Sequence, residues 1–272
     1  MTQNNVSWLA PATGSGYRVV VLGSSTAAGT GASPSSNAWV NRFTTWLQAV
    51  APGSTVTNLA ASGYTTRRVV PTGTPSPANP DQARSITTAL ALNPHLIIVN
   101  LPSNDTNDDA NNPDIELSET MSNFELIKDA ADAEGVKIFF TTTQPRNFTD
   151  LTWRDELEEQ ANLIRSAFGN YVIDIYDELT DFTNNKSIKG IYDSGDGIHV
   201  NNAGHEYIYT TARDKIIPHL LNYEVYRSIS ELTGYELVTR TSSTAVEDIN
   251  LKPGTTYYYK VRTVDFNGVS DF

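Results

Sequence analysis

The sequence predicts an α/β protein: a three-layer α/β/α domain with a five-stranded parallel sheet, followed by a short all-β carboxyl-terminal segment. Apolar runs rich in β-branched residues recur up to Leu221, and each is followed by a longer stretch with helical spacing. Strands that alternate with helices of about ten or more residues form parallel sheets covered on both faces. After Tyr223 the helical spacing stops and short alternating runs begin, which favours antiparallel strands with one exposed face.

The strands of the sheet are expected at residues 17–22, 54–60, 95–101, 137–143 and 171–175. The helices are expected at residues 38–50, 80–93, 115–134, 153–168 and 203–221. Asn79 as N-cap and Pro80 at the first helical position indicate where the second helix begins, and Gly135 indicates where the third ends. Residues 70–80 are crowded with Pro, Gly, Thr and Ser, so they are expected to form a surface loop.

Composition limits the class of partner. The 272 residues include 31 acidic and 19 basic side chains, a formal net charge of -12, which argues against nucleic acid or an anionic membrane as the main partner. Because the chain has no cysteine, thiol chemistry, cysteine-based zinc sites and disulfides are excluded. No uninterrupted apolar run approaches the ~20 residues that a membrane span needs.

Residues 1–16 are polar and rich in small residues, and they lack the basic region and apolar core of a signal peptide. We expect them to be an N-terminal leader segment ahead of the first domain. Their composition fits a cytoplasmic protein, and it also fits a secreted or periplasmic protein whose signal peptide has been removed.

The chemistry is expected at the carboxyl ends of the strands. Gly23, Ser24 and Ser25 end the first apolar run, and the next two strand ends carry Gly63 and Asn104. Ligand crevices of parallel α/β sheets lie beyond this edge. A serine hydroxyl there is a candidate nucleophile, provided that a base takes its proton and a third group orients the base.

His199 is the candidate base. It follows Asp196 by three residues in a Gly-rich loop, which can fold back so that the carboxylate meets one ring nitrogen and leaves the other free. His95, His205 and His219 lie near strand or helix ends, where histidines are ordinarily solvated. The G-x-S-x-G elbow, the Walker A motif and the dinucleotide fingerprint are not met.

Four blocks, at residues 23–26, 58–63, 102–105 and 196–199, together resemble the marker blocks of the SGNH (GDSL-like) hydrolase family. The resemblance covers about residues 17–221 and implies a flavodoxin-like fold. It implies that Ser25 is the nucleophile, with Ser24 as the fallback, that His199 is the general base and then acid, and that Asp196 orients it. The implied oxyanion hole consists of the backbone N–H groups of Ser25 and Gly63 and the side-chain amide of Asn104, with no metal and no organic cofactor. Ser24 stands where the family usually has Asp and Pro102 where it usually has Gly, which is expected to affect rate and pocket shape rather than reaction class.

The implied function is a serine esterase that cleaves short-chain acyl or acetyl esters, including those of carbohydrates, through an acyl-enzyme. The expected partner is therefore a small-molecule or glycan ester. Two alternatives stay open: a lysophospholipase or thioesterase with the same triad, and a non-catalytic carbohydrate-binding or adhesion protein that retains the fold.

One further pattern overlaps the third block. Asp105, Asn107, Asp109 and Glu116 match ligand positions of an EF-hand loop, but the position that needs Gly is Ala110. A solvated acidic loop is therefore favoured over a calcium site.

Residues 251–262, including Tyr257, look like the late strands of a fibronectin type III domain, and residues 223–228 resemble an earlier strand. A whole domain of this class needs ~7 strands, so residues 222–272 are expected to be a partial domain that lacks its first two strands. The fragment should then expose an unpaired edge, which packs on the hydrolase domain or pairs with a second chain to form a homodimer. Such appendages are common on secreted polysaccharide-degrading enzymes, so a secreted or periplasmic location and deacetylation of glycans are favoured.

Overall fold

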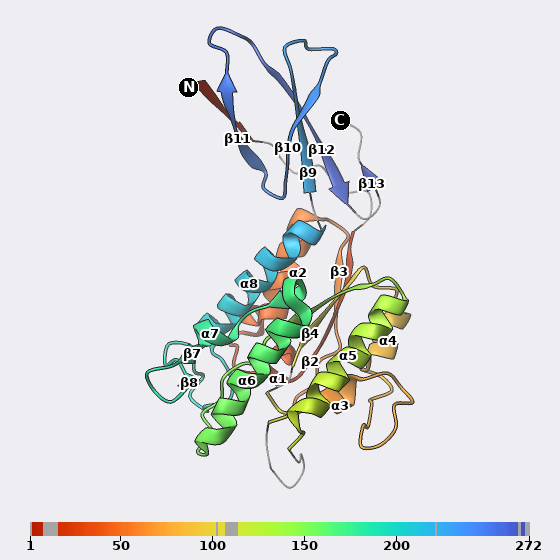
Figure 1. Ribbon diagram of the computed structural model, residues 1–272, viewed down its shortest axis with the longest axis vertical. Helices are drawn as coiled ribbons and strands as arrows, with labels where there is room; N and C mark the ends of the chain where they lie inside the picture. The colour runs from red at the N-terminus through yellow and green to blue at the C-terminus, as the bar shows by residue number, and fades with distance from the viewer. Residues whose placement is uncertain are drawn as a thin grey trace. The chain divides into compact units, whose positions relative to one another are not determined.

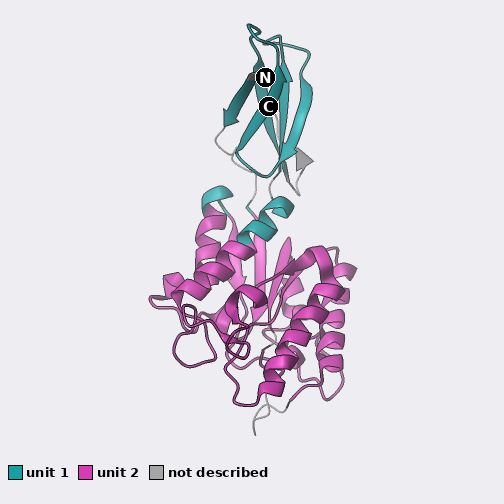
Figure 2. Cartoon of the chain, turned by 60° about the vertical axis from the view of Figure 1, so that its left-hand side comes forward, with its two compact units in different colours: residues 1–16, 49–53, 213–272 teal, residues 17–48, 54–212 magenta. Residues whose placement is uncertain are grey.

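The computed structural model describes residues 2–7, 16–101, 103–106, 114–220, 222–265 and 268–269. The chain divides into two compact units (Figure 2). The larger unit, here called the α/β unit, comprises residues 17–48 and 54–212. The smaller unit, here called the β unit, comprises residues 1–16, 49–53 and 213–272.

The α/β unit is built on a five-stranded parallel sheet, as predicted. Its strands are β2 (Arg18–Gly23), β3 (Thr55–Asn58), β4 (Leu96–Asn100), β5 (Lys137–Thr141) and β6 (Val172–Ile173). They lie in the order β3-β2-β4-β5-β6 (Figure 1), so β2 has β3 on one side and β4 on the other. In a sheet of this order the ligand crevice is expected where the chain changes direction across the sheet, at the carboxyl ends of β2 and β4.

Helices of very different length connect the strands. They are α1 (Ser25–Ala28), α2 (Trp39–Val50), α3 (Thr66–Val69), α4 (Ile86–Ala91), α5 (Leu117–Ala133), α6 (Leu151–Phe168), α7 (Tyr176–Leu179) and α8 (Asn202–Leu220). Single 3-10 turns lie at Ser35–Asn37 and Gly169–Tyr171, and β7 (Thr180–Asp181) pairs with β8 (Ser187–Ile188). Among the described residues, none of the helices has the length and apolar character needed to cross a membrane.

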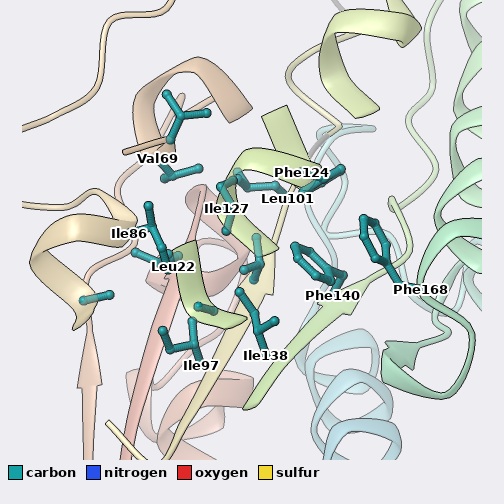
Figure 3. Close-up of a cluster of buried hydrophobic side chains, with 14 of the residues drawn as sticks. Leu22, Val69, Ile86, Ile97, Leu101, Phe124, Ile127, Ile138, Phe140 and Phe168 are labelled. Carbon is teal, nitrogen blue, oxygen red and sulfur yellow. The ribbon is translucent and has the colours of Figure 1, made fainter. Parts of the chain in front are cut away.

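One face of the sheet packs on α4, α5 and α6 (Figure 3). Alternate residues of the strands, such as Leu22, Ile97 and Phe140, enter this core, where the Phe140 and Phe168 rings stack with centroids 4.2 Å apart. The intervening residues of β2 and β4 are also buried, so the sheet is covered on both faces. Figure 1 shows α2 and α8 on the opposite side from α4 and α5, which completes the three layers.

The expected helix over residues 80–93 is wrong in its first half. Only α4 is helical, and it begins after Ser85 as N-cap. The carboxylate of Asp81 accepts a hydrogen bond from the backbone N–H of Ala83 at 2.8 Å, and Arg84 donates to the backbone oxygens of Leu59 and Ala60. A side chain that binds its own backbone offers an alternative to helical hydrogen bonds, which explains the late start.

The β unit contains two sheets. In one, β1 (Thr2–Ser7) pairs with β11 (Ala245–Leu251). In the other, β10 (Glu236–Thr241), β9 (Asn222–Ser228), β12 (Tyr258–Asp265) and β13 (Gly268–Val269) follow one another in this order. All of these pairs are antiparallel.

The position of β1 corrects one expectation. Residues 2–7 are not part of a separate leader, because they form the partner strand of β11. The expectations of a partial fibronectin-type domain and of a second chain at its edge stay predictions. The pairing of β1 with β11 was not predictable from local pattern, because the two strands lie at opposite ends of the chain.

Candidate active site

The candidate nucleophile sits in a tight turn from strand to helix. Ser25 is the first residue of α1 and comes two residues after the end of β2. A Cβ atom at Gly23 would lie 2.6 Å from Ala27 Cβ and 2.9 Å from the backbone oxygen of Asn100, so this turn has room only for glycine. Asn58, at the end of β3, donates from Nδ2 to the backbone oxygen of Ala27 at 2.8 Å and ties the neighbouring strand to α1.

The loop before α8 folds back on itself, as the spacing of Asp196 and His199 predicts. The Oδ1 atom of Asp196 accepts hydrogen bonds from the backbone N–H groups of Ile198 and His199, both at 2.8 Å. Its Oδ2 atom lies 2.6 Å from His199 Nδ1. The other ring nitrogen, Nε2, lies 2.9 Å from Ser25 Oγ. The structure thus brings Ser25, His199 and Asp196 together in that order.

The hydrogen bonds of Asp196 decide its protonation. Burial raises the pKa of its carboxyl, but hydrogen bonds from the His199 ring, from the backbone N–H groups of His199 and Ile198 and from the Ser194 hydroxyl lower it by more, so the pKa lies well below its usual range. An ionised carboxylate can only accept, so His199 Nδ1 carries the proton and Nε2 is left to accept from Ser25 Oγ. This is the tautomer that a general base for Ser25 needs.

The other candidate donors come from the ends of β3 and β4. Gly63 is exposed with a φ of 76°, in the left-handed region that favours glycine. Asn104 donates from Nδ2 to the backbone oxygen of Tyr64 at 3.0 Å, which places it beside the Gly63 turn. Its Oδ1 accepts from Arg146 Nη1 at 3.3 Å.

The two departures from the block pattern differ in outcome. The backbone N–H of Ser24 donates to Asn100 O at 3.3 Å, and its side chain makes no capping hydrogen bond to α1. The His199 imidazole lies against Ser25, which favours Ser25 over the fallback Ser24 as the candidate nucleophile. Pro102 lies outside the described residues.

Of the remaining histidines, His205 differs from expectation. It is fully buried, accepts from the backbone N–H of Trp39 through Nδ1 at 3.3 Å and donates from Nε2 to Thr30 O at 3.0 Å. Burial lowers its pKa. It packs against α2 in the first turn of α8, which sequence position alone does not reveal. His95 accepts from the backbone N–H of Arg18 at 3.1 Å and His219 is half-buried in α8, so neither belongs to the site.

The acidic stretch after β4 is not simply a solvated loop. Asp105 is fully buried and accepts from the backbone N–H and hydroxyl of Thr66 and from the hydroxyl of Thr120, at 2.9, 2.5 and 2.9 Å. Burial raises its pKa to about 6 against the lowering effect of these hydrogen bonds. Asn107 and Asp109 lie outside the described residues, and Glu116 is exposed just before α5. Within the described ranges no three His, Cys, Asp or Glu side chains gather as a metal site would require.

Sequence reasoning missed Gln144, Arg146 and Asn147, which follow β5. Gln144 binds Thr26 and the backbone of Ile198, and Arg146 binds Asn104. A signal was present: a polar run directly after an apolar strand lies at the same carboxyl edge as the blocks.

Comparisons with known proteins show the family and the fold. The model of a family described as the GDSL-like lipase/acylhydrolase family matches residues 21–207. The fold is similar to that of the lipase/acylhydrolase from Enterococcus faecalis, with a TM-score of 0.56 and 20% identity over 74% of this chain and 95% of that one. It is also similar to a catalytic mutant of Axe2, an acetylxylan esterase from Geobacillus stearothermophilus (TM-score 0.53, 19% identity, 75% of this chain and 95% of that one).

A third solved structure, the acetyl xylan esterase AlAXEase, has a TM-score of 0.57 at 14% identity over 73% of this chain and 99% of that one. A comparison with curated proteins returned no match. At these identities the solved structures show a shared fold.

Proposed function

Because this chain belongs to the GDSL-like lipase/acylhydrolase family and is an ester hydrolase, we propose that it is a serine esterase with Ser25, His199 and Asp196 as its catalytic triad. The observation that carries the proposal is the continuous contact from Ser25 Oγ to His199 Nε2 at 2.9 Å and from Nδ1 to Asp196 at 2.6 Å. A base within hydrogen-bond reach of the nucleophile and an orienting carboxylate behind the base are what acyl transfer requires.

In the first half-reaction Ser25 Oγ attacks the ester carbonyl carbon while His199 Nε2 takes the hydroxyl proton. Asp196 holds Nδ1–H and stabilises the imidazolium that forms. His199 then gives its proton to the leaving alcohol oxygen, and the acyl group stays on Ser25. In the second half-reaction His199 takes a proton from water, whose oxygen attacks the acyl carbon, and the proton returns to Ser25 Oγ as the carboxylic acid leaves.

The negative oxygen of each tetrahedral intermediate needs donors. The proposed donors are the backbone N–H groups of Ser25 and Gly63 and the side-chain amide of Asn104. The N–H of a first-turn residue such as Ser25 has no acceptor within its helix, and Nδ2 of Asn104 carries two hydrogens, so its bond to Tyr64 is compatible with this role. A preorganised donor of this kind contributes about 2.7 to 4 kcal/mol to transition-state stabilisation.

The proposed substrates are short-chain esters, acetylated glycans in particular. Two proteins of similar fold are named acetyl xylan esterases, which supports this choice.

The test is hydrolysis of p-nitrophenyl acetate by the wild type, Ser25→Ala and Ser24→Ala. We expect Ser25→Ala to lower kcat by about 10⁴-fold or more, as loss of a triad nucleophile does elsewhere, and Ser24→Ala to retain most of the activity. Equal rates for the wild type and Ser25→Ala would contradict the esterase proposal. Acetate, butyrate and octanoate esters and acetylated xylan then test the substrate class, and a preference for octanoate would exclude deacetylation as the main activity.

A further inference from the structure

One short segment contacts the elements that carry Ser25, His199, Asp196 and Asn104. It is the stretch of residues 144–147, which follows β5, and it is here called the β5 exit segment. Its first side chain, Gln144, is buried. Gln144 Oε1 accepts from the Thr26 hydroxyl at 2.8 Å, and Gln144 Nε2 donates to the backbone oxygen of Ile198 at 2.7 Å. Thr26 follows the candidate nucleophile Ser25, and Ile198 precedes the candidate base His199. The Gln144 side chain therefore links α1 to the loop before α8.

Arg146 is also buried, and it contacts the residues that follow β4. Its Nη1 donates to the backbone oxygen of Ser103 at 3.1 Å and to Asn104 Oδ1 at 3.3 Å. The guanidinium carbon lies 4.6 Å from the centroid of the Phe148 ring, which holds the group in place. Because a guanidinium has only donors, it pairs with the oxygen of the Asn104 amide and directs Nδ2 to the other side.

Asn147 holds the loop that carries Asp196. Its backbone N–H donates to Gly197 O at 2.7 Å, and its Nδ2 donates to Asp193 Oδ2 at 3.0 Å. A Cβ atom at Gly197 would lie 2.9 Å from Asn147 Cβ, so the loop passes directly against this residue. Asp193 and Gly197 flank Asp196, so Asn147 fixes the loop on both sides of the carboxylate.

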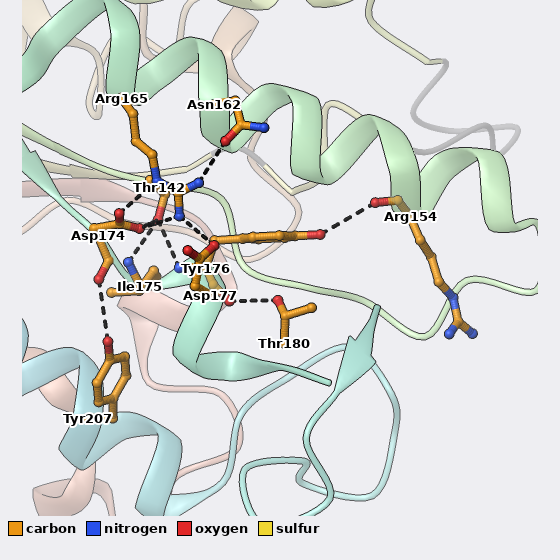
Figure 4. Close-up of polar contacts among 10 residues, drawn as sticks. All are labelled: Thr142, Arg154, Asn162, Arg165, Asp174, Ile175, Tyr176, Asp177, Thr180 and Tyr207. Carbon is orange, nitrogen blue, oxygen red and sulfur yellow. Dashed lines mark hydrogen bonds and ion pairs between the residues drawn. The ribbon is translucent and has the colours of Figure 1, made fainter. Parts of the chain in front are cut away.

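Hydrogen bonds also hold the residues just before the β5 exit segment (Figure 4). Thr142, just after β5, accepts from the backbone N–H groups of Ile175 and Tyr176 at 2.8 and 3.0 Å and donates to Asp174 at 3.2 Å. Arg165 binds the same Asp174 carboxylate at 2.7 and 2.8 Å. The β5 exit segment therefore starts from a rigid point of the sheet.

We propose that the β5 exit segment is the positioning element of the active site: Gln144 sets the spacing between Ser25 and His199, and Arg146 sets the orientation of the Asn104 amide. This inference rests on the proposed triad and oxyanion hole. Neither residue takes part in a bond-making step, and each acts through the catalytic group that it holds.

The first experiment tests Gln144 with Gln144→Met, which keeps the size of the side chain and removes both hydrogen bonds. Misplacement of a catalytic group by about 1 Å costs about 10²-fold in rate, so we expect a fall of that order in kcat on p-nitrophenyl acetate with KM within about twofold. The rate of phosphonylation of Ser25 by an alkyl p-nitrophenyl phosphonate should fall in parallel. Gln160→Met is the matched control, because Gln160 is fully buried in α6 and its amide has no hydrogen-bond partner among the described residues.

The second experiment tests Arg146 in two backgrounds. Arg146→Met should lower kcat by about tenfold or more, towards the loss of about 10²-fold that removal of an oxyanion donor causes. It should weaken a trifluoromethyl ketone inhibitor by the same factor and leave KM unchanged. In an Asn104→Ala background Arg146→Met should have no further effect. With Asn104 present, Arg146→Lys, which keeps a donor, should be more active than Arg146→Met. Arg18→Met is the control, since Arg18 donates to Asn93 O at the opposite edge of the sheet.

Three outcomes would overturn the inference. In the first, Gln144→Met and Arg146→Met lower the melting temperature but keep the wild-type kcat per titrated active site. In the second, Arg146→Met lowers kcat equally with and without Asn104, so that it does not act through the amide. In the third, Gln160→Met and Arg18→Met reproduce the same losses. If Ser25→Ala instead retains wild-type activity, the proposed function itself fails, and the two failures are therefore distinguishable.

Discussion

Ser25 Oγ lies 2.9 Å from His199 Nε2, although the two residues are 174 positions apart in the sequence. The contact depends on two local structures, the glycine turn after β2 and the folded loop before α8. Changes that leave Ser25 and His199 intact but disturb either local structure should therefore lower activity.

Asp196→Asn tests the loop. An amide can offer a donor to Nδ1 and thereby favour the tautomer with Nε2 protonated, which cannot accept the Ser25 proton. We expect kcat to fall by about 10⁴-fold with a small change in KM, measured on p-nitrophenyl acetate. A loss below tenfold would mean that Asp196 does not orient the base.

The same carboxylate predicts a pH dependence of stability. The folded-state pKa of Asp196 lies below the unfolded-state value of about 3.9, so its contribution to the free energy of unfolding is present above about pH 4 and is lost as the pH falls through the folded-state value. The difference in melting temperature between wild type and Asp196→Asn should therefore shrink as the pH falls below about 4. A difference that vanishes near pH 6 contradicts the ionised state assigned to Asp196.

Gly23→Ala tests the turn. The added Cβ would meet Asn100 O, a backbone atom, at 2.9 Å, so the turn must shift. Overpacking of this kind costs about 1 to 3 kcal/mol of stability, and we expect a larger proportional loss of kcat because Ser25 moves with the turn. Gly190→Ala is the control, since a Cβ at Gly190 has nothing within 4 Å. Thermal unfolding and ester hydrolysis measure both effects, and a fully active Gly23→Ala would show that the turn tolerates a side chain.

Asp105 predicts the opposite pH dependence to Asp196. Burial raises its folded-state pKa to about 6, so between about pH 4 and 6 the folded state binds the proton more strongly than the unfolded state. Its contribution to the free energy of unfolding therefore falls as the pH rises through this window, by about 3 kcal/mol in all. Asp105→Asn should remove this dependence, as measured by urea unfolding at pH 4.5 and 7.5.

The control for that experiment is Asp129→Asn, which removes an exposed carboxylate from α5. If wild type and Asp105→Asn show the same change in unfolding free energy between the two pH values, Asp105 does not titrate in this window.

Val6→Pro tests the strand that the amino terminus adds to the β unit. Val6 pairs with Val246 in the β1–β11 ladder, and proline cannot donate a hydrogen bond there. We expect a lower melting temperature for the β unit and, because an unpaired edge invites pairing with another chain, a larger particle in light scattering. Val6→Ala keeps the ladder and is the control. In Val6→Pro, kcat should change by less than about twofold because Ser25 and His199 lie in the α/β unit. A variant with unchanged melting temperature and size would show that β1 contributes nothing.

Much of the α/β unit follows from local pattern. The order of the strands and long helices was predictable because each carries its own hydrophobic period, and the parallel sheet followed from their alternation. The start of α4 was not predictable, because the bond from Ala83 to Asp81 competes with helix formation at that position only. The short helices α1, α3 and α7 were also missed, since single turns have no period.

By itself the sequence determined the class of the fold and the chemistry at its edge, because hydrophobic period, glycine turns and the Asp196–His199 spacing are local properties of the chain. Only the tertiary structure decided which other distant groups meet: Gln144 with Thr26 and Ile198, Arg146 with Asn104, and β1 with β11. The physical reason is that a hydrogen bond between remote residues depends on how the strands are ordered in the sheet. No local pattern records that order.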